Sequence, residues 1–240
     1  MIKSSKSRFV NKIFSLYITR LLYKHFYRIH ICGEENIYSL NNGFPTILYA
    51  NHSNWWDGFV AYFLSSKRWK QDDYLMMDIE QMKKYPFFKY LGVFSVDRAN
   101  PRDSMNTINY TVSLLKETNR FLWIFPQGLM HLQDHRPIEF FSGITSLAEK
   151  IGSVNLQPVA IRYEFILEQR PEIFIRLGNA DIINNSHLIN KDFTVYLRDK
   201  LIKELDTLKD DVVSNNYKDY SIVFWGKESR NKTIDRITPN

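Results

Sequence analysis

The chain has 240 residues, 44% of them hydrophobic and 24% charged, a balance that excludes an intrinsically disordered protein and suits one domain with its own core. Its single cysteine, Cys32, excludes an internal disulfide, and no run of about 20 apolar residues predicts a transmembrane helix. The net charge of +6 is concentrated near the start of the chain, because residues 1–33 hold seven basic residues and no acidic one.

Residues 9–27 predict an amphipathic helix that lies on a membrane surface. Apolar residues recur there at spacings of three and four, as on one helix face: Val10, Ile13, Tyr17 and Leu21. Basic residues interrupt the apolar run: Lys12, Arg20 and Lys24. A basic helix rich in aromatic residues is typical of an interfacial anchor. The alternative is an ordinary helix packed on the domain, with its basic residues in solvent.

The partner expected for this basic segment is therefore a lipid surface. Nucleic acid is not expected as a partner, because no recognised nucleic-acid-binding motif accompanies the basic residues. We expect a peripheral or monotopic protein at the cytoplasmic face of the membrane.

Strands and helices alternate along the rest of the chain. Strands are predicted at residues 45–50, 74–77, 93–96, 121–125, 154–162 and 173–177. Helices are predicted at residues 57–64, 80–91, 101–115, 143–151 and about 191–213. This alternation predicts an α/β fold with a central, mostly parallel sheet flanked by helices and preceded by the amphipathic segment.

The clearest chemical motif follows the first predicted strand. Residues 51–58, Asn-His-Ser-Asn-Trp-Trp-Asp-Gly, join that strand to a helix, and α/β folds place their sites at such strand ends. His52 is suited to act as a base near neutral pH, and Asp57 can hold its tautomer and stabilise the imidazolium. Such a base suits an acyl transfer in which the hydroxyl of the acceptor molecule attacks a thioester directly, so that no protein nucleophile is needed. Ser53, beside the histidine, keeps a hydrolase as an alternative.

The Asn-His-x4-Asp pattern resembles the first signature of the glycerolipid acyltransferase family, which includes the 1-acylglycerol-3-phosphate acyltransferases. Residues 92–98, 125–128 and 157–160 resemble three further blocks of that family, in the same order. The resemblance spans roughly residues 35–185. We expect an acyltransferase domain at residues 34–226, between the membrane-surface segment at 1–33 and a polar, mobile tail at 227–240.

The resemblance also implies the reaction. A fatty acyl group would pass from acyl-CoA or acyl carrier protein to a hydroxyl of a lipid acceptor, 1-acylglycerol-3-phosphate or a related lysolipid. No cofactor or metal is expected for this chemistry, and no glycine-rich nucleotide loop is present.

The resemblance implies that His52 and Asp57 form the catalytic dyad. It implies a substrate-binding set of Arg98, Asn51, Gln127 and Gly128. The planar fork of a guanidinium suits a phosphate or another polar head group. The alternative for Arg98 is a salt bridge, with Asp97 or Asp103 as candidates. The neighbourhood of Gly128 is a candidate source of amides for an oxyanion.

The third block departs from the family pattern. Gln127 replaces the usual glutamate, and Leu129 and Met130 stand where threonine and arginine usually follow. Arg136 replaces the missing arginine only if its loop folds back toward the site. The loss of charge raises a sugar hydroxyl, on a glycolipid or a glycosylated carotenoid, as an alternative acceptor. A non-catalytic membrane lipid-binding protein is a second alternative, and a hydrolase using Ser53 or water is a third.

Other residues have two interpretations. Trp55 and Trp56 either line an acyl channel or belong to the core. The aromatic cluster at residues 85–88 either faces lipid or ends a helix. His131 and His135, four apart, would share one helix face, but two ligands alone are a weak metal site.

Overall fold

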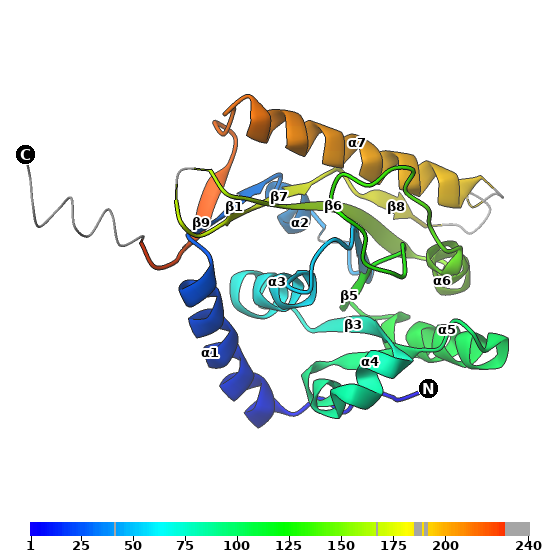
Figure 1. Ribbon diagram of the computed structural model, residues 1–240. Coiled ribbons are helices and arrows are strands. Elements are labelled where there is room, and N and C mark those ends of the chain that lie inside the picture. The colour runs from blue at the N-terminus through cyan, green and yellow to red at the C-terminus, as the bar shows by residue number, and fades with distance from the viewer. Residues whose placement is uncertain (41, 167, 185–188, 190–191, 229–240) are drawn as a thin grey trace, which may run out of the picture.

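The computed structural model describes residues 1–40, 42–166, 168–184, 189 and 192–228. The strands of this part are β1 (Arg28–Cys32), β2 (Thr46–Ala50), β3 (Asp73–Asp78), β4 (Val93–Val96), β5 (Phe121–Ile124), β6 (Val154–Glu164), β7 (Glu172–Leu177), β8 (Asp181–Ile183) and β9 (Ser221–Trp225). They form one nine-stranded sheet in the order β4-β3-β5-β2-β6-β7-β1-β9, with β8 beside β6 (Figure 1). The pairs from β4 to β6 are parallel, whereas β7, β8 and β9 each form an antiparallel pair with a neighbour.

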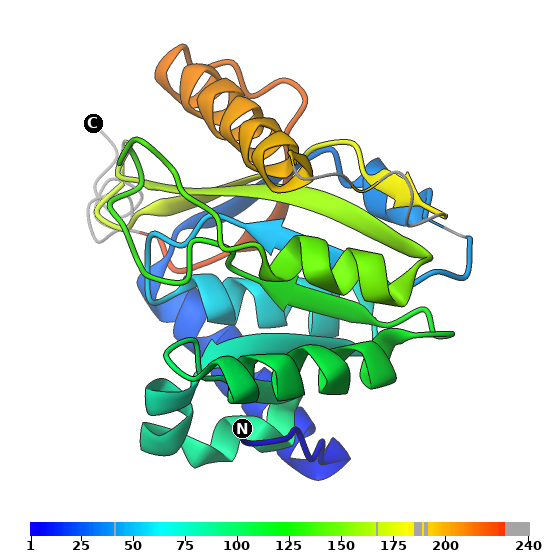
Figure 2. The ribbon, with the colours of Figure 1, turned by 90° about the vertical axis from the view of Figure 1, so that its right-hand side faces the viewer.

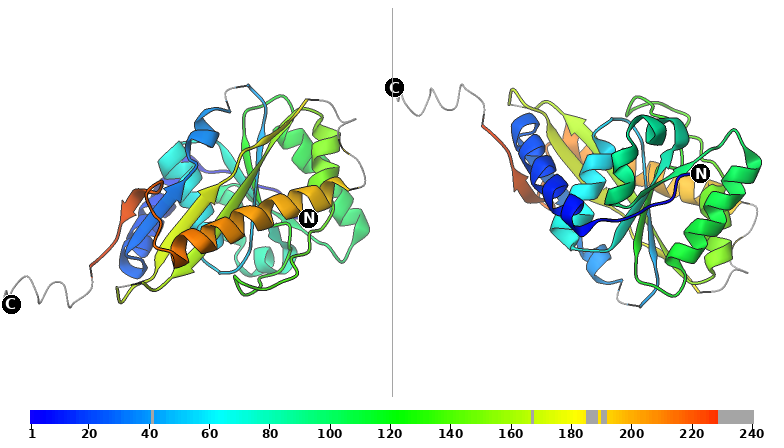
Figure 3. Two further views of the ribbon diagram at one scale, coloured as in Figure 1. Left: turned by 90° about the horizontal axis from the view of Figure 1, so that it is seen from above. Right: turned by 90° about the horizontal axis from the view of Figure 1, so that it is seen from below.

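Helices cover both faces of this sheet. They are α1 (Arg8–His25), α2 (Glu35–Tyr38), α3 (Asp57–Phe63), the π-helix η1 (Leu64–Trp69), α4 (Ile79–Lys84), the 3₁₀-helix η2 (Pro86–Leu91), α5 (Pro101–Leu115), α6 (Gly143–Ile151) and α7 (Phe193–Val213). Side chains of α1, α3 and η2 pack in one core, and those of α5, α6 and α7 pack in the other. Figure 2 shows α5 and α6 in front of the sheet with α3 behind it, and Figure 3 shows α7 and α1 on opposite sides.

The central strand β2 shows why the two cores are separate. All five of its residues are buried, as expected for a parallel strand covered on both faces. Successive side chains of a strand point to opposite faces, so Ile47 and Tyr49 enter one core while Leu48 and Ala50 enter the other. The predicted α/β architecture, with its mostly parallel sheet and its N-terminal helix, is confirmed.

Two details of the prediction are corrected. The single helix predicted at residues 80–91 is two helices, α4 and η2, that meet at Tyr85 and Pro86. Proline has no amide hydrogen to donate and its ring clashes with the preceding turn, so α4 ends there. Three short strands near the sheet edges, β1, β8 and β9, were not predicted, although the alternation of Ile29 and Ile31 is a signal for β1. Most of the predicted mobile tail, residues 229–240, lies outside the described residues.

Helix α1 packs on the domain through one face. Ile18 and Leu22 are buried there, and the ring of Phe14 lies 5.2 Å from that of Tyr62 on α3. The predicted apolar face is divided: Val10 and Leu21 pack against the core, whereas Ile13 and Tyr17 are exposed. No helix in the described part of the chain has both the length and the apolar character needed to span a bilayer.

Candidate active site

The loop after β2 is held in place by two side-chain amides. Asn51 donates from Nδ2 to the carbonyl of Ile161 (2.9 Å) and accepts at Oδ1 from the Ile161 amide (2.8 Å), which extends the pairing of β2 with β6. Gln127 accepts at Oε1 from the backbone amide of His52 (2.7 Å). The polar atoms of Asn51 and the oxygen of Gln127 thus hold the backbone at the motif.

Asp57 is the centre of the hydrogen bonds behind the histidine. Its side chain is fully buried at the first turn of α3. Oδ2 accepts from His52 Nδ1 (2.8 Å) and from the amides of Ser53 (2.8 Å) and Asn54 (2.9 Å). Oδ1 accepts from the hydroxyl of Tyr163 (2.7 Å). Four donors therefore converge on this carboxylate and fix its position.

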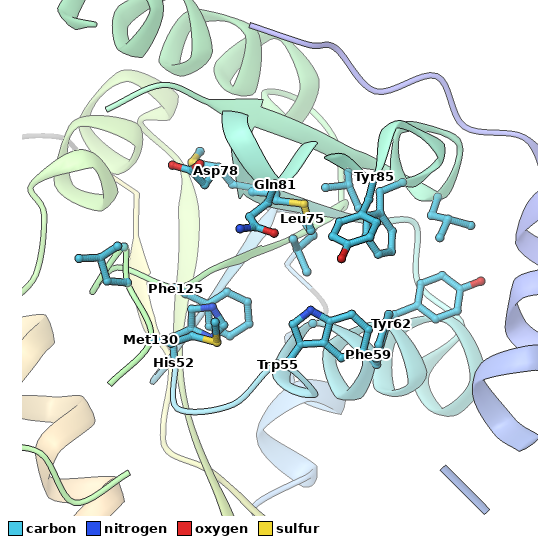
Figure 4. A pocket seen from close by; sticks show the side chains of 18 of the residues that line it. His52, Trp55, Phe59, Tyr62, Leu75, Asp78, Gln81, Tyr85, Phe125 and Met130 are labelled. Carbon is cyan, nitrogen blue, oxygen red and sulfur yellow. The ribbon is translucent and has the colours of Figure 1, made fainter. Parts of the chain in front are cut away.

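The imidazole of His52 faces a cavity. Because a carboxylate accepts the hydrogen at Nδ1, Nε2 is the lone-pair nitrogen, and no described residue bonds it. The imidazole stacks on Phe125, with ring centroids 4.5 Å apart. The ring lines a cavity of about 340 Å³, which we call the larger cavity (Figure 4).

The larger cavity is apolar and runs along β3, between the sheet and the helices α3 and η2. Its walls include the aromatic side chains of Trp55, Phe59, Tyr85, Phe88 and Phe125. The two tryptophans differ in their surroundings. Trp55 lines the cavity, whereas the ring of Trp56 packs edge-on against the buried Phe26, with ring centroids 4.9 Å apart. Tyr85 and Phe88 line it as well, whereas Phe87 is partly exposed beside Phe14.

Asp73, at the other end of β3 from Asp78, brings a buried carboxyl to the larger cavity. Burial raises its pKa to about 7, although Lys6 Nζ, 3.9 Å away, lowers it in part. The unfolded chain releases this proton near pH 3.8, so the folded state loses stability as the pH rises from about 4 to about 7.

Replacing Asp73 by asparagine should therefore stabilise the protein most at high pH. We expect a gain in the free energy of unfolding of up to about 4 kcal/mol at pH 8, declining as the pH is lowered toward 4. Urea denaturation of the variant and the wild type at pH 8 and pH 5 measures this difference. The exposed Asp210, replaced in the same way, is the control. An equal gain at both pH values would contradict the assignment.

Arg98 lies where the larger cavity meets a smaller one of about 280 Å³. Arg98, Asp78 and Gly128 line both cavities. The guanidinium donates to Asp78 Oδ2 at 3.2 Å, so the ion partner is Asp78 and not Asp97 or Asp103. Arg98 is the one cationic side chain among the described residues that line either cavity.

Gly128 allows the close approach of three segments at this junction. Its φ is +72°, and a Cβ there would lie 2.6 Å from the ring of Phe141 and 3.2 Å from Arg98 Cζ. Its amide donates to the carbonyl of Phe125 (2.9 Å), so this amide is used by the turn. Beyond Phe141, the first residues of α6 line the smaller cavity together with Ser104 and Thr107 of α5.

The remaining predicted groups lie outside the junction. Arg136 does not compensate for the missing arginine of the third block, because it pairs with Asp206 on α7 at 2.6 Å. His131 and His135 stack on each other, with ring centroids 4.8 Å apart. No group of three or more metal-binding side chains occurs within the described residues.

Two residues of the site were missed from sequence. Asp78 is the last residue of β3, and the position of a carboxylate at a strand end is a signal that the sequence contains. Tyr163 lies 106 residues after Asp57 and carries no local signal.

Comparisons with known proteins find a matching family model, similar sequences and a similar fold. A family model described as "Acyltransferase" matches residues 28–162, more than half of the chain. The 1-acyl-sn-glycerol-3-phosphate acyltransferase of Streptococcus pneumoniae is 25% identical over 172 residues, which are 69% of this chain and 61% of the relative. The protein of the same name from Saccharomyces cerevisiae is 25% identical over 138 residues, 55% of this chain and 42% of the relative. The matches thus span less than two thirds of either relative.

A solved structure shares the fold. The crystal structure of the 1-acyl-sn-glycerophosphate (LPA) acyltransferase PlsC from Thermotoga maritima superimposes with a TM-score of 0.54 and 15% sequence identity. The likeness covers 84% of this chain and 79% of that one.

Proposed function

Because this chain belongs to the acyltransferase family, we propose that it transfers a fatty acyl group from acyl-CoA or acyl carrier protein to a hydroxyl of a lipid acceptor. The proposed acceptor is 1-acylglycerol-3-phosphate or a related lysolipid, the class named for both curated relatives. The observation that carries the proposal is the His52–Asp57 hydrogen bond at the edge of a large apolar cavity.

In the proposed mechanism, His52 Nε2 removes the proton of the acceptor hydroxyl while the oxygen attacks the thioester carbonyl. The tetrahedral intermediate then breaks its carbon–sulfur bond, and the leaving thiolate takes the proton from the imidazolium. The products are the acyl ester and the free thiol. Asp57 stabilises the imidazolium between these two steps, as a buried carboxylate does in other histidine-based enzymes.

The shape and lining of the two cavities support an assignment of the substrates. We assign the acyl chain to the larger cavity, since each buried methylene contributes about 0.8 kcal/mol. We assign the acceptor head group to the junction at Arg98 and Gly128, where polar side chains meet the edge of this cavity.

A sugar hydroxyl, on a glycolipid or a glycosylated carotenoid, is a second candidate acceptor. The charge at the junction favours it, because Arg98 is the one cation among the described residues that line the cavities, and it is already paired with Asp78. A phosphomonoester carries about −1.5 to −2 charges at pH 7 and usually meets several donors. A neutral head group needs fewer hydrogen-bond donors.

The test is acyl transfer from a radiolabelled acyl thioester to two acceptor pools, lysophosphatidic acid and a mixed glycolipid extract. Label in the lysophosphatidic acid product supports the leading proposal, and label in glycolipid alone supports the second. Free fatty acid released without acceptor indicates a hydrolase. Absence of both products, with labelled lipid retained, indicates a non-catalytic lipid-binding protein.

Arg98→Gln should discriminate between the acceptors. If Arg98 binds a phosphate, the KM for lysophosphatidic acid should rise at least about tenfold, because a charge-assisted hydrogen bond contributes roughly 1.5–3 kcal/mol. The KM for a neutral glycolipid should change less than about threefold. Arg102→Gln, at an exposed residue outside both cavities, is the matched control. An unchanged KM for lysophosphatidic acid would assign its head group elsewhere.

We further propose that the outer face of α1 places the protein on the cytoplasmic face of a membrane, as a peripheral or monotopic protein. This outer face consists of the exposed residues Phe9, Lys12, Ile13, Leu16, Tyr17, Arg20 and Lys24. Phe9 is 73% exposed, and Ile13, Leu16 and Tyr17 are each 53% exposed. Large apolar side chains beside basic ones suit the boundary of an anionic bilayer. Phe14 of α1 packs against the core and lines the larger cavity, so the helix joins the surface to the proposed acyl site.

A further inference from the structure

Tyr163 extends the hydrogen-bonded chain behind His52 by one residue. Its hydroxyl donates to Oδ1 of Asp57, the oxygen that His52 does not use. Burial and the neighbouring carboxylate raise the pKa of Tyr163 well above its ordinary value, so the phenol remains a donor at any pH at which the protein works. The order from the cavity inward is therefore imidazole, carboxylate, phenol.

The surrounding structure holds Tyr163 in this position. Gln133, in the loop that follows the third sequence block, clamps its backbone: Oε1 accepts from the Tyr163 amide (3.1 Å) and Nε2 donates to its carbonyl (3.3 Å). The tyrosine ring lies tilted against the buried Phe26, with centroids 5.9 Å apart. Tyr163 lines neither cavity, so it does not contact the substrates as we place them.

We propose that Tyr163 is a positioning residue for the reaction: through Asp57 it sets both the orientation of His52 and the strength with which His52 holds a proton. The proposal rests on the proposed acyl transfer. The phenol fixes the plane of the carboxylate, because Oδ1 has no other donor among the described residues. It also withdraws charge from the carboxylate, which then attracts the imidazolium less strongly.

Few other charged groups face this chain of residues. On the cavity side, the paired Arg98 and Asp78 line the same cavity as His52. From α1, His25 stacks obliquely on Trp56 at 5.3 Å. From the loop after β5, His131 donates its backbone amide to the His52 carbonyl. We expect the loss of the phenol hydroxyl to leave these contacts unchanged, because none of them involves Tyr163.

The test is Tyr163→Phe, with Tyr49→Phe as the matched control. Tyr49 is a buried tyrosine of the neighbouring strand β2, and its hydroxyl has no hydrogen-bond partner among the described residues. In Tyr163→Phe we expect kcat to fall about tenfold and KM to stay within about twofold. The acid limb of the pH profile of kcat/KM should move to higher pH by about half to one unit. Tyr49→Phe should show none of these changes.

A second readout does not require catalysis. The proton on His52 Nδ1, shared with Asp57, gives a downfield proton NMR resonance that is identified by its loss in His52→Ala. In Tyr163→Phe this resonance should shift, whereas in Tyr49→Phe it should not. A wild-type acid limb and an unshifted resonance in Tyr163→Phe would overturn the proposal. Failure of the wild type to transfer label to any acceptor would instead refute the proposed function, and the resonance would still decide the role of Tyr163.

Discussion

Acyl transfer by the His52→Ala variant is expected to be at least about a thousandfold slower than by the wild type. Among the described residues, His52 offers the one unbonded ring nitrogen beside the larger cavity that is backed by a buried carboxylate. Without it, the acceptor hydroxyl keeps its proton and remains a poor nucleophile. The assay is initial rates with a radiolabelled thioester and the acceptor that the wild type accepts.

The fold should survive this substitution. The His52 side chain is 23% exposed and makes one ring contact, on Phe125, and one hydrogen bond, to Asp57. Asp57 keeps its three other donors when that hydrogen bond is lost. Circular dichroism and thermal denaturation should therefore remain close to the wild type. His135→Ala, which removes an exposed imidazole outside both cavities, is the control and should retain full activity. Transfer by His52→Ala within a few-fold of the wild type would rule out the base mechanism.

Reversing three charges on the outer face of α1 should abolish binding to anionic vesicles. Lys12, Arg20 and Lys24 are exposed, and each basic residue near an anionic surface contributes about 1 kcal/mol. Glutamate at all three positions should lower the partition coefficient at least about a hundredfold. Flotation with phosphatidylglycerol-containing vesicles measures this, and vesicles of phosphatidylcholine alone should show a much smaller change.

Substitution is a sharper test than removal of the helix. Deleting residues 1–28 would also remove the buried Ile18 and Leu22, and would cut into β1, so loss of binding would be confounded by loss of the fold. The control reverses three exposed lysines on the other side of the sheet or in its loops, Lys116, Lys203 and Lys218. Equal binding by the α1 variant and the wild type would refute the membrane assignment. An equal loss of vesicle binding in both variants would mean that the net charge of the protein, and not the outer face of α1, governs binding.

The architecture and the proposed catalytic pair were accessible from the sequence because their signals are local. Alternating strands and helices predicted the α/β fold, and His52 and Asp57 are five residues apart on one strand–loop–helix unit. A turn of the chain is enough to bring such side chains together. The end of α4 before Pro86 could also have been predicted from the sequence, because the missing amide hydrogen of proline is a property of one residue.

The tertiary structure alone decided what surrounds that pair. The sheet places β6 beside β2, which brings Ile161 to Asn51 and Tyr163 to Asp57, across more than 100 residues of chain. Arg98 was expected to pair, if at all, with an acid close in sequence, but β3 and β4 are parallel neighbours and their ends bring Asp78 to it. Sequence spacing carries no information about such contacts, because they depend on strand order and register. Helix α1 shows the same division: its periodicity was readable, but which of its apolar side chains are buried depended on the helices packed against it.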